Sequence, residues 1–130
     1  MNKELLSYCE KEIQDFLDKK LIRKSKPPWS CSTFYVQNQV ELGRGTPRLV
    51  INYKPLKDAL RWIRYPIPNK KDLLQRLVKF NVFSKFDIKS RFWQIQIAEK
   101  HGHKITFVVP FGYYEWNIMP FGLKNALSEF

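Results

Sequence analysis

Asp87 is the carboxylate whose sequence surroundings point most directly to chemistry. It lies between Phe86 and Ile88 in a run, residues 83–88, that is typical of a β-strand. A carboxylate among large apolar side chains needs a compensating partner, because burial alone would raise its pKa. We therefore expect a cation or a bound metal ion beside it. From spacing alone, a solvent-facing aspartate at the end of a strand is the open alternative.

The chain breaks its pattern at residues 89–91 and then alternates over residues 93–97. This alternation predicts a second strand. Its apolar face is expected to consist of Trp93, Ile95 and Ile97, with the two intervening glutamines on the polar face.

Four short motifs occur in a fixed order along the chain. They are RLVINYK at residues 48–54, YPIP at 65–68, FSKFD at 83–87 and MPFGLKN at 119–125. Together they resemble the fingers and first palm segment of reverse transcriptases. The resemblance is to the enzymes of plant pararetroviruses (caulimovirus-like), which sit close to those of Ty3/gypsy retrotransposons. It extends from about Leu5 to Phe130.

This resemblance implies two-metal phosphoryl transfer with Mg²⁺ as the cofactor. Asp87 matches the first catalytic aspartate of the family, and the Ile88 carbonyl matches a second metal ligand. Arg48 matches the basic residue that contacts the triphosphate of the incoming dNTP, since a guanidinium offers forked donors and stays charged. Backbone N–H groups of Ser90, Arg91 and Phe92 would cradle phosphate oxygens.

The remaining matched positions concern sugar selection and the template. Phe92 matches the gate that excludes a 2′-hydroxyl and so selects deoxynucleotides. The segment at residues 119–125 matches the one under the nucleotide and template, which makes Phe121 and Gly122 nucleotide contacts. Gly122 suits that place because a missing Cβ lets the backbone approach a ligand closely. The expected template contacts are Asn52, Lys54 and Lys124, and the expected partners are an RNA or DNA template–primer and a dNTP.

Relatives complete the site with a Tyr-x-Asp-Asp turn, whereas no aspartate follows Asp87 here. We therefore expect this chain to be the amino-terminal half of a reverse transcriptase, such as a decayed integrated element would encode. We expect this half to be inactive alone. Two alternatives stay open: a non-catalytic basic module that binds nucleic acid, and a remnant with no function. Without its palm partners, the strand at residues 83–88 is expected to promote self-association.

Composition agrees with a nucleic-acid partner. The net charge is +11, from 23 Lys+Arg against 12 Asp+Glu, which indicates a polyanionic partner, and the 15% aromatic content favours nucleic acid over a membrane surface. Cys9 and Cys31 form no Cys-x-x-Cys pair, so neither a zinc site nor a disulfide framework is expected. No apolar run approaches the ~20 residues of a membrane span and no signal-peptide pattern opens the chain, so we expect an intracellular protein without a membrane partner.

Several elements must position these residues. Periodic apolar residues between 5 and 17 predict a packing helix, and the charge run at residues 19–26 predicts a solvated face or a phosphate contact. Residues 33–36 and 48–53 predict a hairpin, and residues 98–103 a polar, solvated turn. A second hairpin is predicted from residues 105–109 and 114–118. A short helix at residues 70–78 should turn four apolar residues inward: Leu73, Leu74, Leu77 and Val78.

These elements lack regular βαβ alternation and predict an α+β fold. By resemblance, this is the fingers plus partial palm of a right-hand reverse transcriptase fold, truncated before the Tyr-x-Asp-Asp hairpin. Residues 1–130 would form one partial domain. Its fingers would comprise about 1–61 and 95–125, and its partial palm about 62–94 and 126–130.

Overall fold

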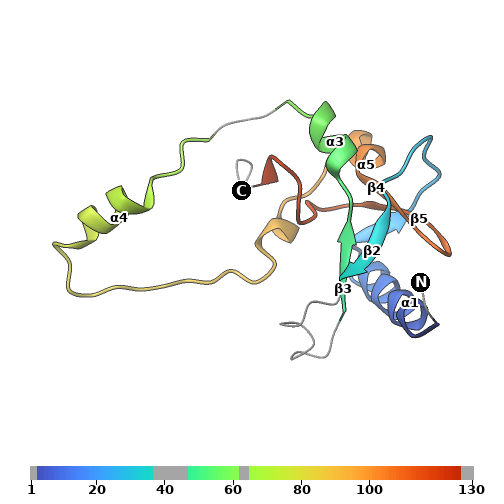
Figure 1. Ribbon diagram of the computed structural model, residues 1–130, viewed down its shortest axis with the longest axis horizontal. Helices are drawn as coiled ribbons and strands as arrows, with labels where there is room; N and C mark the ends of the chain where they lie inside the picture. The colour runs from blue at the N-terminus through green and yellow to red at the C-terminus, as the bar shows by residue number, and fades with distance from the viewer. Residues whose placement is uncertain (1–2, 37–46, 62–64, 127–130) are drawn as a thin grey trace.

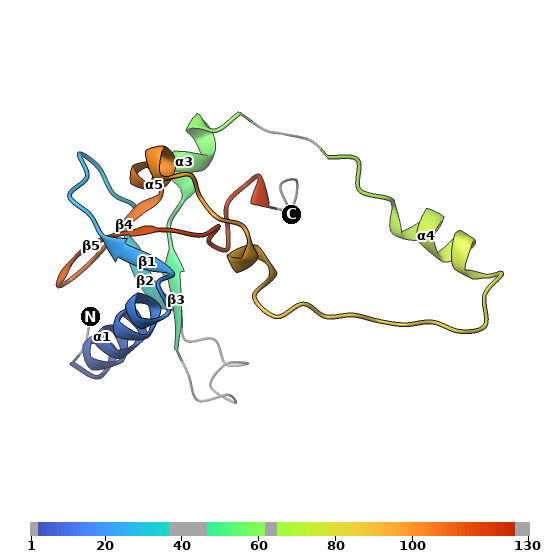
Figure 2. The same ribbon diagram turned by 180° about the vertical axis from the view of Figure 1, so that it is seen from behind.

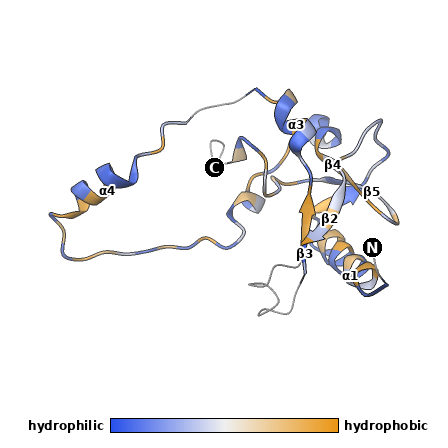
Figure 3. Ribbon diagram, in the orientation of Figure 1, coloured by the Kyte–Doolittle hydropathy of each residue, from blue (hydrophilic) through white to orange (hydrophobic). Residues whose placement is uncertain are grey.

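The computed structural model describes residues 3–36, 47–61 and 65–126 (Figure 1). The predicted first helix is confirmed as α1, Lys3–Asp18. Its buried residues, Cys9, Ile13 and Phe16, recur at helical spacing. Figure 3 shows the resulting mixture of hydrophobic and hydrophilic positions along α1.

A three-stranded antiparallel sheet packs near α1 and has the order β1-β5-β4. Strands β4, Thr106–Val109, and β5, Gly112–Trp116, form the predicted second hairpin. Strand β1, Ile22–Lys24, lies inside the charge run and was not predicted as a strand. Ile22 is buried and Arg23 lies opposite Glu115 on β5. Pairing with β5 therefore makes residues 22–24 a strand, although the local sequence does not predict one.

A second sheet carries the first predicted hairpin. Strand β2, Thr33–Val36, pairs antiparallel with β3, Arg48–Ile51; the connection between them, residues 37–47, lies mostly outside the described residues. The two sheets are joined at Cys31, whose N–H bonds to the Thr106 carbonyl at 2.9 Å and whose carbonyl accepts from the Val108 N–H at 3.0 Å. After β3 comes the short helix α3, Lys54–Ala59, with proline in its first turn.

The core fills the space between α1 and the two sheets. It is aromatic at its centre, where the Trp116 ring contacts the rings of Phe16 and Phe107 with centroids 5.5 and 5.6 Å apart. Tyr53, at the end of the β3 segment, is also buried there. This core holds the segments before and after β5 in place, and the second of them leads to residues 119–125.

Helix α4, Lys70–Leu77, was predicted correctly as a helix but not as a packed one. The chain from residue 65 to residue 90 swings away from the sheets and carries α4 at its far end (Figures 1 and 2). Leu73, Leu74, Leu77 and Val78 are all exposed, Val78 by 82%. The inward-facing prediction is therefore wrong for this chain, because no described element lies against that face.

The two strands predicted around Asp87 are not formed. Residues 83–88 belong to neither sheet, and residues Arg91–Gln94 form a 3-10 helix, η1. Among the described residues, the one β-bridge made by this stretch joins Gln96 to Ile118. The predicted faces nevertheless hold, since Trp93, Ile95 and Ile97 are partly buried and both glutamines are exposed.

The predicted polar turn at residues 98–103 is mostly helical. It contains α5, Glu99–Gly102, followed by a second 3-10 helix at His103–Ile105. His101 and His103 are exposed, as expected of a solvated segment. No helix among the described residues has the length and apolar character needed to cross a membrane.

Candidate nucleotide and template site

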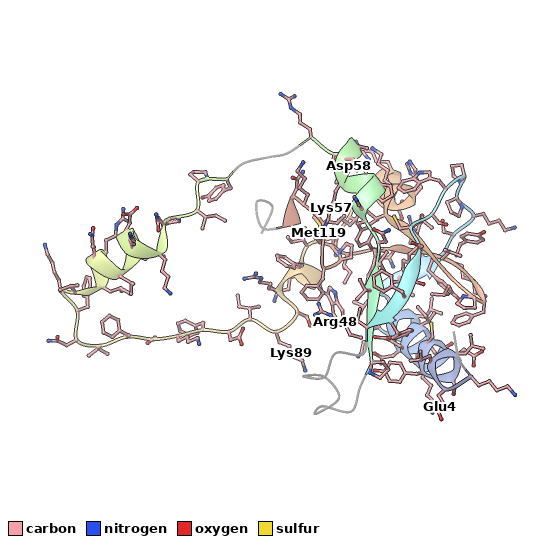
Figure 4. All side chains as sticks on the ribbon, viewed as in Figure 1. Glu4, Arg48, Lys57, Asp58, Lys89 and Met119 are labelled. Atoms are coloured by element: carbon pink, nitrogen blue, oxygen red, sulfur yellow. The ribbon has the colours of Figure 1, made fainter. Side chains whose placement is uncertain are left out.

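A cavity of about 450 Å³ lies between α1, β3, η1 and the segment after β5. Three residues predicted to contact the nucleotide, Arg48, Phe121 and Gly122, line it together. They come from positions more than 70 residues apart, Arg48 at the start of β3 and the other two after β5. In Figure 4, Arg48 is seen at the start of β3 and Lys57 on α3.

Aromatic contacts link the predicted gate to this cavity. Phe92 is buried on η1, and its ring meets the Phe121 ring edge-on with centroids 5.4 Å apart. The Arg91 guanidinium lies 4.7 Å from the centroid of the Phe92 ring, a cation–π contact. Trp93 contacts Phe121 at 5.8 Å and lines the cavity. The ring of Phe121 is therefore held between η1 and the cavity.

Ser90 sets the entry to η1. It has left-handed backbone angles (φ 50°, ψ 42°), which are uncommon for a residue other than glycine, and its carbonyl accepts from the Trp93 N–H at 2.9 Å. The turn directs the chain out of the extended segment and into the 3-10 helix. Ser90, Arg91 and Phe92 thus lie together at the start of one turn.

The predicted template residues lie around the end of β3. The Asn52 side-chain oxygen accepts from the Lys54 N–H at 3.1 Å, and both residues are exposed. A Cβ on Gly122, whose φ is +91°, would lie 4.0 Å from the Tyr53 ring, so residues 52–54 and the 120–125 segment come close there. Lys124 is exposed on that segment. The structure therefore brings the template and nucleotide positions to one region.

Asp87 and Ile88 do not lie in this region. Asp87 is exposed in the extended segment, and its neighbours Phe86 and Ile88 are 89% and 48% exposed. The expectation that Asp87 is buried among apolar side chains is wrong, because none of the described helices or strands packs over residues 83–88. No group of three metal-ligating side chains occurs in the described residues. Asp87 alone does not fit a two-metal site, and the residues that the structure describes do not assemble one.

Several residues that line the cavity were not predicted as site residues, among them Glu12, Lys57 and Trp93. Burial raises the pKa of the Glu12 carboxyl, opposed by the Tyr35 hydroxyl that donates to it at 2.7 Å. Trp93 could have been found, since the alternation at residues 93–97 placed it on the apolar face. Lys57 carries no signal in the sequence that separates it from other lysines.

Comparison with known proteins agrees with this geometry. Residues 22–130 match the family model of the reverse transcriptase (RNA-dependent DNA polymerase). A genome polyprotein of Petunia vein clearing virus (isolate Shepherd) is 45% identical over 130 residues, all of this chain and 6% of that protein. An enzymatic polyprotein of Cauliflower mosaic virus (strain NY8153) is 43% identical over 121 residues, 93% of this chain and 18% of that protein. The chain therefore spans a small part of these relatives.

Solved structures share the fold. A foamy viral protease–reverse transcriptase in complex with an RNA/DNA hybrid superimposes with a TM-score of 0.76 at 16% identity. The match covers 97% of this chain and 16% of the foamy viral chain. The mixed helix and strand arrangement is thus that of part of a reverse transcriptase fold. On these grounds the chain belongs to the reverse transcriptase (RNA-dependent DNA polymerase) family and is caulimovirus-like.

Proposed function

We propose that this chain supplies the fingers and the first part of the palm of an RNA-directed DNA polymerase. In this role it holds the incoming dNTP and the template. The observation that carries the proposal is the shared cavity of Arg48, Phe121 and Gly122, to which Phe92 is joined by ring contact. Residues so distant in sequence gather there only through the fold.

The proposed fingers comprise about residues 1–61 and 95–125, and the proposed partial palm about 62–94 and 126–130. The described helices and strands of the proposed fingers form both sheets and most of the core. Much of the second set is the exposed segment that carries α4 and Asp87. Ala126 is buried with Phe92 and Met119 in a separate small cluster, which supports grouping it with η1.

Each residue then has a stated task. Arg48 pairs its forked guanidinium with triphosphate oxygens. The Phe92 ring, fixed against Phe121, blocks the space of a 2′-hydroxyl and so favours deoxynucleotides. The N–H groups at residues 90–92 approach phosphate oxygens, and Gly122 lets the backbone approach the base pair closely. Asn52, Lys54 and Lys124 contact the template strand; the related foamy viral structure contains an RNA/DNA hybrid.

Catalysis needs more carboxylates than the described residues bring together. The family uses divalent metal ions, and Asp87, with the Ile88 carbonyl, would contribute one part of an Mg²⁺ site. Because no aspartate follows Asp87 in this sequence, the other ligands would come from another polymerase segment. The chain by itself is therefore proposed to bind its ligands without extending a primer.

Binding of dTTP to the 130-residue chain with primer–template tests the nucleotide site, with calorimetry as the measurement. Arg48→Gln should weaken dTTP binding by about tenfold or more, the size of a lost charge-assisted hydrogen bond. The dTTP affinity of Arg48→Lys should lie between those of the unchanged chain and Arg48→Gln, since lysine keeps the charge but loses the forked donors. The control, Arg76→Gln, removes an exposed arginine from α4 and should change little. Equal losses in Arg48→Gln and Arg76→Gln would refute the site.

A second function, a non-catalytic nucleic-acid-binding module, is favoured by the net charge of +11. It predicts salt-sensitive binding of primer–template, like the first function, but no saturable dTTP binding. The same calorimetric titration therefore separates the two. Saturable dTTP binding that Arg48→Gln weakens by about tenfold or more supports the polymerase segment.

A further inference from the structure

A second groove, of about 410 Å³, lies where the end of β1 meets the tip of the β4–β5 hairpin. It shares no residue with the cavity around Arg48. Figures 1 and 2 both show this hairpin tip at the opposite end of the molecule from α4. The groove, here called the hairpin groove, is lined by Lys24, Ser25, Lys26, Phe111, Gly112, Tyr113 and Tyr114.

Two aromatic rings of the hairpin groove face solvent. Phe111 is 39% and Tyr113 is 48% exposed. The Phe111 ring meets the buried Tyr114 ring edge-on, with centroids 6.4 Å apart, and is held in place by it. The Tyr113 ring contacts no other ring among the described residues, and nearly half of the residue's surface is exposed. Exposed rings of this kind are stacking platforms for planar groups.

The charge of the hairpin groove is positive. Lys24 and Lys26 are exposed, and none of the described residues that line the groove carries a carboxylate. The nearest acid along β5, Glu115, is buried and accepts hydrogen bonds from Arg23 Nε and, at 3.1 Å, from Ser25 Oγ. The charge of Glu115 is compensated by Arg23. Among the described residues, neither Lys24 nor Lys26 forms an ion pair, so these two lysines give the groove its positive charge.

Backbone pairing makes the groove rigid. Lys24 pairs with Tyr114 in the β1–β5 register, and the Ser25 N–H extends the pairing to the Tyr113 carbonyl at 3.0 Å. Lys24 and Tyr113 are therefore held on adjacent, hydrogen-bonded strands, with Lys26 and Phe111 just beyond the ends of those strands. A ligand meets a preorganised surface and loses less entropy than it would in ordering a loop.

We infer that the hairpin groove binds an unpaired nucleic-acid strand, with bases stacked on Tyr113 and Phe111 and phosphates beside Lys24 and Lys26. The strand must be unpaired because base faces in a duplex are already covered by their neighbours. Rings and lysines together match the chemistry of single-strand binding, in which stacking is sequence-tolerant and phosphate contact depends on salt. The inference rests on the proposed function only in that this chain handles nucleic acid.

Fluorescence anisotropy of labelled strands on the 130-residue chain tests the stacking. Tyr113→Leu keeps an apolar side chain but removes the ring, and should weaken binding of a short oligothymidylate by about tenfold. Binding of an abasic strand of equal length should stay unchanged, since it has the phosphates and lacks the bases. Tyr113→Trp should restore binding of oligothymidylate. Unchanged oligothymidylate affinity in Tyr113→Leu would overturn the inference.

Charge is tested with a matched pair of double variants. Lys24→Gln with Lys26→Gln should lower the slope of log K against log salt by about 1.4 for oligothymidylate, that is about 0.7 per phosphate contact. Lys71→Gln with Lys79→Gln removes the same charge from exposed positions around α4 and should change the slope of log K against log salt little. Equal falls in both double variants would show charge without a site and overturn the inference.

Failure here is distinguishable from failure of the proposed function. Tyr113 lies outside the Arg48 cavity, so Tyr113→Leu should leave dTTP binding unchanged. If Arg48→Gln weakens dTTP binding as predicted while Tyr113→Leu leaves oligothymidylate binding intact, only the hairpin groove is refuted. Loss of dTTP binding in Tyr113→Leu would mean that the two sites are not separate.

Discussion

Replacing Arg23 with methionine removes the cation that compensates Glu115 at the junction of β1 and β5. The two residues are direct cross-strand partners, and Arg23 Nε donates to Glu115 Oε1. The Glu115 side chain is only 10% exposed, whereas that of Arg23 is 40% exposed. Methionine keeps the length and apolar stem of the side chain, so the change tests charge and hydrogen bonding more than packing.

The cost follows from what Glu115 retains. After the substitution the carboxylate keeps the Ser25 hydroxyl, which donates at 3.1 Å. Breaking a fully buried ion pair costs about 3–5 kcal/mol and losing a hydrogen bond to a charged group about 1.5–3 kcal/mol. Because Arg23 is partly exposed and water enters where it leaves, we expect the lower value, about 2 kcal/mol. Glu115→Gln in the Arg23→Met background should recover about half of it, since a neutral amide needs no counter-charge.

Urea unfolding followed by circular dichroism measures this cost. With a slope of about 1.5 kcal/mol per molar urea, Arg23→Met should lower the midpoint by roughly 1 M. The control is Glu99→Gln, which removes the other carboxylate near Arg23. Its oxygen lies 3.7 Å from the guanidinium and its side chain is 93% exposed, so the midpoint should hardly move. A loss under about 0.5 kcal/mol in Arg23→Met, or losses that simply add in the double variant, would refute the reasoning.

Three further outcomes are expected. Burial raises the pKa of Glu12, so the folded state binds its proton more tightly and stability should fall as pH rises above about 4.5 through the folded-state pKa. Glu12→Gln should flatten this part of the dependence of thermal stability on pH, and should raise the free energy of unfolding at neutral pH by less than about 1 kcal/mol. An unchanged pH dependence in Glu12→Gln would contradict this prediction. Amides at residues 83–88 should exchange hydrogen faster than those of β3, and the exposed apolar side chains there should make the chain associate; slow exchange in a proven monomer would contradict this. Finally, the purified chain should extend no primer with Mg²⁺ or Mn²⁺, and incorporation of dNTPs that Asp87→Asn abolishes would show that the site is complete.

The sequence alone was sufficient where local pattern decides structure. The spacing of Cys9, Ile13 and Phe16 predicted α1, because one apolar stripe on a helix needs only a surface to bury it. The hairpins β2–β3 and β4–β5 were also predicted, since each consists of two strand-like segments that follow one another in the chain. Motif order was enough for the family, which the comparisons confirm.

The tertiary structure decided what depends on partners distant in the chain. Residues 83–88 have strand-like composition but form no strand, because a strand needs hydrogen bonds from a neighbour and none of the described segments provides them. Strand β1 forms within a charge run because β5 pairs with it and Glu115 compensates Arg23. The cavity of Arg48, Phe121 and Gly122 exists only because the aromatic core brings β3 beside the segment after β5. Side-chain pattern is local, whereas pairing, burial and the meeting of distant residues are set by the whole fold.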